Sequence, residues 1–469
     1  MKVVRYLALG AIAMTLSMPA QAQDNKAEID AITKVITANP TGCADQVKEV
    51  YKRNKKNPEV LVGIGNAYLQ AKDLVNAEKY ANLAIEKNKK YAPAYILLGD
   101  VAVAKDDGGA AASWYQQAQY FDPKNPQGYI KYAWIYRGRS PEEAVAKLED
   151  LRAQMPEYPV DAEAAHIYYM SNKFSKAVER FDKVDRSKMD ADQLGEYAFA
   201  ALLNKDAKKS LEVSEYGLSR FPRSATLNRI AFYCNAEMEN FPEAERYANA
   251  LYNNSDSAKI GFLDNFNYGN VHMGNKNYDS AISSFEAALQ ENPDHTGAIK
   301  NLSDAYAAKK DYENALKHYA NYLSKVDKKQ ATDVAALASL YEDAADGVGL
   351  TTAAGKDYLA KADATYEQLE KEFPTASVYA NFRRAYLHLT KYDNGDVSKG
   401  GAAPYYQKLI DELAAKTDRT ETDNTRLEKA YEYIGAYKLY TDQKDYKEYF
   451  EKVYELNPDN ANAKQVLNK

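Results

Sequence analysis

The sequence predicts an all-α protein, an α-solenoid built from helical hairpins that repeat along the chain. Only 22 of its 469 residues are Gly and 15 are Pro, and a chain poor in both favours helices over turn-rich β folds. Its prolines recur at multiples of one short period: Pro123 and Pro156 are 33 residues apart, and Pro123 and Pro293 are 170 apart. A fixed period of this length is typical of repeat architectures, in which each unit buries its apolar face against the next.

The N-terminus is predicted to be a secretory signal peptide spanning residues 1–22. Lys2 and Arg5 form a basic start, and a short apolar run follows. This run is too short to cross a membrane, and Ala20-Gln21-Ala22 supplies the small residues of a cleavage site. No later segment is long and apolar enough to span a membrane. We therefore expect a soluble exported protein cleaved after Ala22, periplasmic if the source is a Gram-negative bacterium.

Composition and missing motifs exclude several classes of function. Lys and Arg total 61 against 67 Asp and Glu, a net charge of −6, which argues against nucleic-acid binding. Two Cys and five scattered His exclude a disulfide scaffold and close-spaced zinc ligands. There is no Gly-rich phosphate loop, nucleophile elbow or HExxH motif. The sequence thus predicts no metal, no cofactor and no enzymatic activity.

The repeating unit has a recognisable pattern. A large residue is followed by a small one and a Tyr, then by a polar turn, an Ala, an aromatic residue, another Ala and a Pro. The clearest copies lie at 92–125 and 262–295. In the first copy the pattern residues are Tyr95, Leu98, Gly99, Ala111, Tyr115, Ala118 and Pro123.

This pattern resembles the tetratricopeptide repeat (TPR). About eleven copies in near-register cover most of the chain. The resemblance implies two amphipathic helices per repeat, stacked into a right-handed superhelix. The small residues of the first helix, such as Gly65, Gly99 and Gly269, are expected to let it pack closely on the second, where a larger side chain would force the pair apart.

The repeats suggest a division of the chain into four parts. After the signal peptide, residues 23–57 are predicted to form an N-terminal capping hairpin, and residues 58–330 to form repeats 1–8. Residues 331–469 are predicted to form repeats 9–11, with long turns at 345–355 and 393–401 and a capping helix from Ala461 to Leu467. Cys43 and Cys234 lie more than five repeats apart, so we expect no disulfide between them.

The concave face is the predicted binding surface, because first helices line it in the family that the chain resembles. The middle repeats place aromatic residues and Met there, which are enriched at protein interfaces. A slightly different register would bury the same residues as core. The candidate partner-binding residues are Trp134, His166, Tyr169, Met170, Phe199, Phe232, Phe266, Asn270 and Met273.

These observations favour a scaffold or adaptor that holds a protein or peptide partner in its groove, in envelope complex assembly or secretion. The alternative is a glycan-binding protein, in which groove aromatics stack on sugar rings. Some proteins of the TPR family clamp a C-terminal carboxylate with Lys and Asn. Only Lys300, Asn301 and Asn270 match that set here, so this activity is not predicted.

Overall fold

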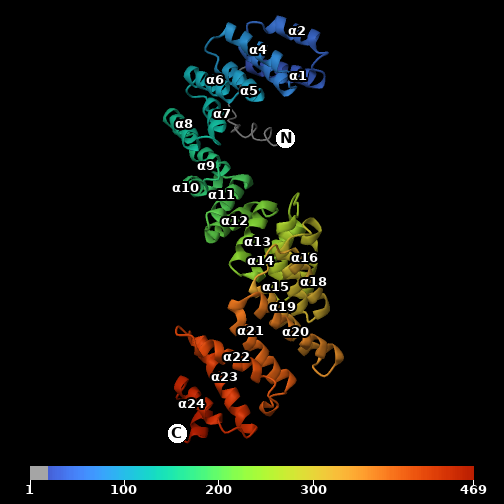
Figure 1. Ribbon diagram of the computed structural model, residues 1–469. Coiled ribbons are helices and arrows are strands. Elements are labelled where there is room, and N and C mark those ends of the chain that lie inside the picture. Colours follow the sequence, from blue (N-terminus) through green and yellow to red (C-terminus); the bar gives the residue numbers. More distant parts are fainter. Residues whose placement is uncertain (1–19) are drawn as a thin grey trace. The chain divides into compact units, whose positions relative to one another are not determined.

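The structure is a computed structural model that describes residues 20–469. Residues 1–19, which make up most of the predicted signal peptide, lie outside the described residues. Within the described range the chain forms helices in sequential pairs and no strand (Figure 1). The prediction of an all-α solenoid is confirmed. No helix in this range combines the length and the apolar character needed to cross a membrane.

The chain divides into two compact units, Met1–Cys234 and Asn235–Lys469. The boundary falls within α13 (Ala225–Glu237). The helices of the first unit are α1 (Ala20–Ala38), α2 (Ala44–Asn54), α3 (Pro58–Gln70), α4 (Leu74–Lys87), α5 (Ala92–Ala104), α6 (Gly108–Phe121), α7 (Pro126–Tyr136), α8 (Pro141–Gln154), α9 (Val160–Met170), α10 (Phe174–Phe181), the 3₁₀ turn η2 (Arg186–Lys188), α11 (Ala191–Leu203) and α12 (Ala207–Arg220).

The second unit continues the same alternation. Its helices are α14 (Phe241–Asn254), α15 (Phe262–Gly274), α16 (Tyr278–Glu291), α17 (Thr296–Ala308), α18 (Tyr312–Lys325), α19 (Ala331–Val348), α20 (Ala353–Glu372), η3 (Pro374–Ala376), α21 (Ser377–Leu387), the π-helical turn η4 (His388–Tyr392), η5 (Val397–Lys399), α22 (Ala403–Ala414), α23 (Glu421–Tyr440), α24 (Tyr446–Leu456) and α25 (Ala461–Leu467).

The turns within the hairpins share one local design. In the α5–α6 hairpin, Asp106 adopts a left-handed conformation with φ 61°, which reverses the chain. Asp107 follows as the N-cap of α6, and its carboxylate accepts a hydrogen bond from the Ala110 N–H at 2.9 Å. The pairs Lys72-Asp73, Lys205-Asp206, Lys276-Asn277 and Lys310-Asp311 repeat this arrangement.

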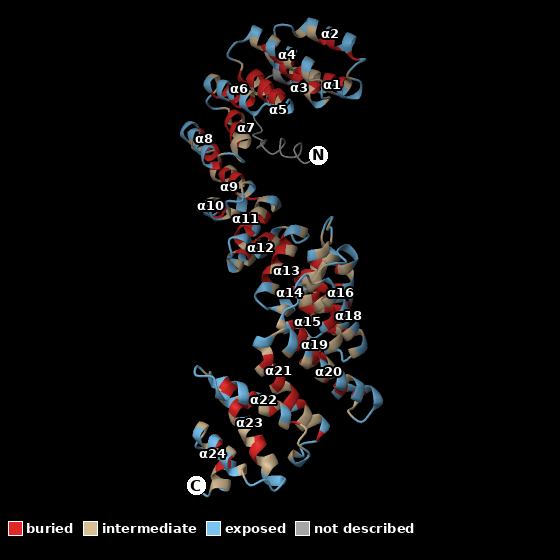
Figure 2. Cartoon of the chain, viewed as in Figure 1, coloured by how far each residue is buried: buried red, intermediate tan, exposed pale blue. Residues whose placement is uncertain are grey.

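Small residues let the two helices of a hairpin approach, as the repeat pattern predicts. A Cβ added at Gly269 would lie 2.5 Å from the Phe285 ring, and one at Gly65 would lie 2.5 Å from Leu97. At the equivalent position Ser303 donates its hydroxyl hydrogen to the Ala315 carbonyl at 2.8 Å. Buried residues therefore follow the packed faces of successive helices (Figure 2), and each unit has a core that is extended along the stack.

Polar side chains also join the first helices of neighbouring hairpins. Lys131 on α7 donates to Asp100 on α5 at 2.8 Å, and Asn301 on α17 donates to Asn270 on α15 at 2.8 Å. The paired residues are 31 positions apart in both cases. This separation is slightly less than one repeat, so the contact connects adjacent turns on facing helices.

One predicted turn is wrong. Residues 345–355 were expected to form a long connection, but α19 runs to Val348 and α20 begins at Ala353. The connection is short because the Ala- and Asp-rich stretch continues as helix. Gly349 ends α19 with φ 91°, and the Thr352 hydroxyl caps α20 by accepting from the Gly355 N–H at 2.9 Å. In contrast, residues 393–401 contain only the short turn η5, between η4 and α22.

The two cysteines are buried in separate places. The Cys43 thiol lies 3.6 Å from the Tyr68 hydroxyl, and the Cys234 thiol donates to the Ser210 hydroxyl at 3.2 Å. There is no disulfide in the described part of the chain, in agreement with the sequence-based expectation. Both thiols act as small buried groups of the core.

Candidate partner-binding face

The first helices α7, α9 and α11 carry most of the candidate residues of the first unit. Trp134 lies on α7, His166, Tyr169 and Met170 lie on α9, and Phe199 lies on α11. Trp134, His166 and Tyr169 are half-buried. Met170 and Phe199 are more open, with exposed fractions of 44% and 36%. The structure therefore places these five residues on neighbouring helices at the surface of one unit.

Trp134 is packed against two cationic or cation-forming side chains. The Arg137 guanidinium carbon lies 3.7 Å from the centroid of the Trp134 ring. The His166 ring stacks on the indole with a centroid separation of 5.7 Å and an interplanar angle of 5°. The Ser171 hydroxyl, at the end of α9, donates to the Arg137 carbonyl at 2.6 Å. These contacts join α7 to α9.

His166 is held in turn by Glu196 of α11. The two Glu196 carboxylate oxygens lie 2.8 and 3.0 Å from His166 Nδ1. Burial by itself would lower the pKa of His166, but the hydrogen bond and the charge of Glu196 outweigh it, so the pKa is raised. Glu163, on the same helix as His166, has a pKa raised by burial. The structure thus favours the charged imidazolium beside the indole.

An apolar surface continues from this cluster along α9 and α11. The Tyr169 ring meets Phe199 edge-on at 6.4 Å between centroids and Phe174 at 6.3 Å. Leu203 lies one turn beyond Phe199 on the same face of α11, and 45% of its surface is exposed. We call Tyr169, Met170, Phe199 and Leu203 the α9–α11 face. It gathers large exposed apolar side chains from two adjacent first helices.

Phe232 does not join this face. It was expected to project into the groove, but its exposed fraction is 0%, and its ring packs 5.1 Å from that of Tyr233. Because Phe232 is enclosed by the protein, no partner can contact it in this conformation. The register that buries a groove position as core, which the sequence left open, therefore applies to Phe232.

The three candidates of the second unit contact neighbouring helices. Phe266 lies 6.1 Å from Phe285 and 5.3 Å from His295, measured between ring centroids. Phe266 and Met273 both pack, half-buried, against the buried cluster that contains Phe285. Asn270 accepts the hydrogen bond from Asn301 described above. Phe266 and Met273 thus contribute to packing between hairpins.

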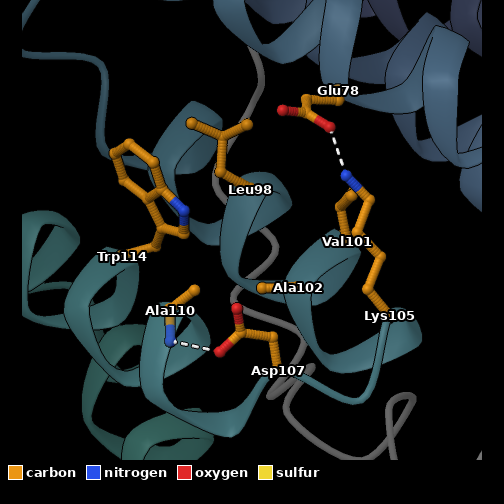
Figure 3. Close-up of a pocket in the computed structure, with 8 residues that line it drawn as sticks. All are labelled: Glu78, Leu98, Val101, Ala102, Lys105, Asp107, Ala110 and Trp114. Atoms are coloured by element: carbon orange, nitrogen blue, oxygen red, sulfur yellow. Dashed lines mark hydrogen bonds and ion pairs between the residues drawn. The ribbon is translucent and has the colours of Figure 1, made fainter.

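The largest hollow of the first unit lies elsewhere, among α4, α5 and α6 (Figure 3). It has a volume of about 260 Å³ and is lined by Leu98, Val101, Ala102, Ala110, Trp114 and three charged residues. Two of the charged residues, Lys105 and Glu78, pair at 2.5 Å, and the third, Asp107, caps α6. Small-molecule sites usually enclose about 300–1,000 Å³ with polar groups free to orient the ligand, and these polar groups already have partners.

Within residues 24–469, no group of three or more His, Cys, Asp or Glu side chains is arranged to hold a metal ion. Two functional residues escaped the sequence analysis. Glu196 binds His166 from the neighbouring first helix, and Leu203 completes the apolar face. The signal for Glu196 was its position 30 residues after His166, close to the spacing of the other contacts between first helices.

Comparison with known families agrees with this geometry. The model of the tetratricopeptide repeat family matches residues 272–341, a stretch that holds α16, α17 and α18. The chain is a tetratricopeptide repeat protein. Proteins of this family are generally scaffolds for protein interaction. No curated protein matches the whole sequence significantly.

Solved TPR structures show the same kind of helical stack. The C-terminal part of a TPR repeat-containing protein from Cytophaga hutchinsonii is 18% identical, with 58% of this chain and 99% of that chain covered and a TM-score of 0.45. A TPR protein from Parabacteroides merdae is 18% identical, with 53% and 98% covered and a TM-score of 0.35. PilF from Pseudomonas aeruginosa is 16% identical, with 52% and 94% covered and a TM-score of 0.32.

Proposed function

We propose that this TPR protein is an exported scaffold that binds a protein or peptide partner through the α9–α11 face, in the assembly of an envelope complex or in secretion. The observation that supports this proposal is the exposure of Met170, Phe199 and Leu203 on adjacent first helices. Large apolar side chains that gather on one open surface usually mark a binding site. The proposed export depends on the basic and apolar pattern of residues 1–22.

A protein partner fits this surface better than a glycan. Sugar rings need an open, flat aromatic face, and the Trp134 ring is covered by Arg137 at 3.7 Å and stacked with His166. Tyr169 meets Phe199 edge-on, so these two rings form no common platform. The open groups are flexible aliphatic and thioether side chains, which adapt to the side chains of a protein.

The test is affinity capture from envelope extract with a face variant and a matched control. The face variant carries Met170→Ser, Phe199→Ala and Leu203→Ser. The control carries Val75→Ser and Tyr120→Ala, which remove exposed apolar groups from α4 and α6. We expect the face variant to lose the partner that the native chain captures, and the control to retain it.

Affinity and stability must be measured on the same proteins. If Phe199 is a contact residue, Phe199→Ala weakens binding by about 1–4 kcal/mol and changes stability less. A loss of about 3–5 kcal/mol in unfolding free energy would instead identify Phe199 as core, and the proposal would fail. Binding to a glycan array that disappears in the face variant would support the sugar-binding alternative.

A further inference from the structure

The second unit has an aromatic surface on α21 that the function proposed above does not use. Tyr379, Phe382 and Tyr386 occur at intervals of three and four residues, so they share one face of the helix. Tyr379 and Phe382 are half-buried, and 45% of Tyr386 is exposed. The face is therefore open to solvent near the end of α21.

Two cations of α23 lie over these rings. The Arg426 guanidinium carbon is 5.5 Å from the Phe382 centroid and 6.0 Å from the Tyr379 centroid. The Lys429 ammonium nitrogen is 5.8 Å from the Phe382 centroid. Both distances are within the range of cation–π attraction, so the two positive charges are held near the same ring.

Neither of these cations is neutralised by the protein. Among the described residues, Arg426 and Lys429 form no hydrogen bond or ion pair with a carboxylate. A third cation, Arg383, is different: it lies 5.6 Å from the Tyr386 ring but is paired with Glu342 at 2.8 Å. We call Tyr379, Phe382, Tyr386, Arg426 and Lys429 the α21–α23 face.

We propose that the α21–α23 face binds a short acidic segment of a protein partner. Arg426 and Lys429 are one helical turn apart, which places their charges within reach of one or two neighbouring carboxylates. An apolar side chain of the same segment would cover Phe382 and Tyr386. The charge complementarity and the open rings together select an acidic peptide that also carries an aromatic or aliphatic residue.

The surrounding charges favour a short acidic segment over a long polyanion. Glu432 follows Lys429 by one turn on α23, and Asp343 and Asp346 extend from α19 beside the Glu342–Arg383 pair. A nucleic acid that passed beyond the two cations would meet these carboxylates and be repelled. A peptide with one or two acidic residues would avoid this cost.

The experiment uses a fluorescein-labelled decapeptide that contains Glu-Glu-Phe-Phe within Gly and Ser, and the same peptide with Gln-Gln-Phe-Phe. Binding to the full chain is followed by fluorescence anisotropy at low salt. We expect the acidic peptide to bind at least tenfold more tightly than the neutral one, and added salt to weaken its binding. The double variant Arg426→Gln, Lys429→Gln should bind the acidic peptide at least tenfold more weakly than the native chain.

The matched control is Lys444→Gln, Lys447→Gln, which removes the same charge from exposed positions before and within α24. It should bind the acidic peptide as the native chain does. Equal weakening in both double variants would mean general charge attraction and would overturn the proposal. So would undetectable binding of the acidic peptide at 1 mM (about 4 kcal/mol of affinity), or binding of oligothymidylate in place of the peptide.

This test is independent of the α9–α11 face. The variant with Met170→Ser, Phe199→Ala and Leu203→Ser should bind the acidic peptide normally, because its changes are confined to the first unit. Failure of the acidic-peptide proposal would therefore leave the partner-capture result unaffected, and the reverse is also true.

Discussion

Replacing Gly99 with Ala should destabilise the α5–α6 hairpin, although Ala is the better helix former. A Cβ at Gly99 would lie 2.6 and 2.8 Å from two carbons of the Tyr115 ring, and closer still to a third. Tyr115 is buried, so the ring cannot swing into solvent. Overpacking of this kind costs about 1–3 kcal/mol.

The displaced ring would also lose polar contacts. The Tyr115 hydroxyl donates to Asp100 at 2.8 Å, and Asp100 in turn binds Lys131 of the next hairpin. Weakening a hydrogen bond of this type adds about 0.5–1.5 kcal/mol. A gain of up to about 1 kcal/mol from the better helix propensity of Ala opposes these losses. We expect a net loss of about 1–3 kcal/mol.

Gly109 provides the matched control, because it lies in the same hairpin and accepts the same substitution. It is exposed near the start of α6, and the nearest heavy atom to an added Cβ is 3.6 Å away. Gly109→Ala should therefore leave stability unchanged or raise it by up to about 1 kcal/mol.

Urea unfolding of both variants, followed by far-UV circular dichroism and by the fluorescence of Trp114 on α6, gives the comparison. Trp114 lies 6.2 Å from Tyr95 and therefore reports on this hairpin. The reasoning is refuted if Gly99→Ala is as stable as the native chain. It is equally refuted if both glycine variants lose the same free energy.

Two further predictions concern charged groups. Asp363→Asn should cost about 3 kcal/mol in urea unfolding, the lower end for a buried pair, because it breaks the bond at 2.8 Å to the buried Arg384; Asp357→Asn, whose exposed pair with Lys361 is on the same helix, should cost little, and similar losses in both would contradict this. The pKa of His166 is raised above 6.5 by Glu196 despite burial, so its stabilising contribution is complete below pH 6.5 and is lost as pH rises through the raised value; His166→Gln should reduce the decline of the urea midpoint between pH 6.5 and 8, and an unchanged decline would contradict the role of this pair.

The helical hairpins and their packing slots could be predicted from the sequence, because they depend on local pattern. The period of 33 or 34 residues places Gly99 and Gly269 opposite Tyr115 and Phe285, and the structure shows those contacts. A repeat has only one way to bury its apolar face, so the same small residue must meet the same ring in each copy. The helical extent of 345–355 was missed because Gly and Thr resemble turn residues when only the pattern is considered.

The candidate face depended on information that the pattern lacks. Trp134, Phe199 and Phe232 occupy similar positions in their repeats, yet Phe199 is exposed and Phe232 is buried. Their exposure depends on the side chains that neighbouring helices bring against them, and these differ from repeat to repeat. The pairing of His166 with Glu196 and the gathering of Arg426 and Lys429 over Phe382 also join residues from different hairpins. Sequence therefore determined which residues line the first helices. Only the tertiary structure decided which of them remain open to a partner, because that depends on packing between repeats.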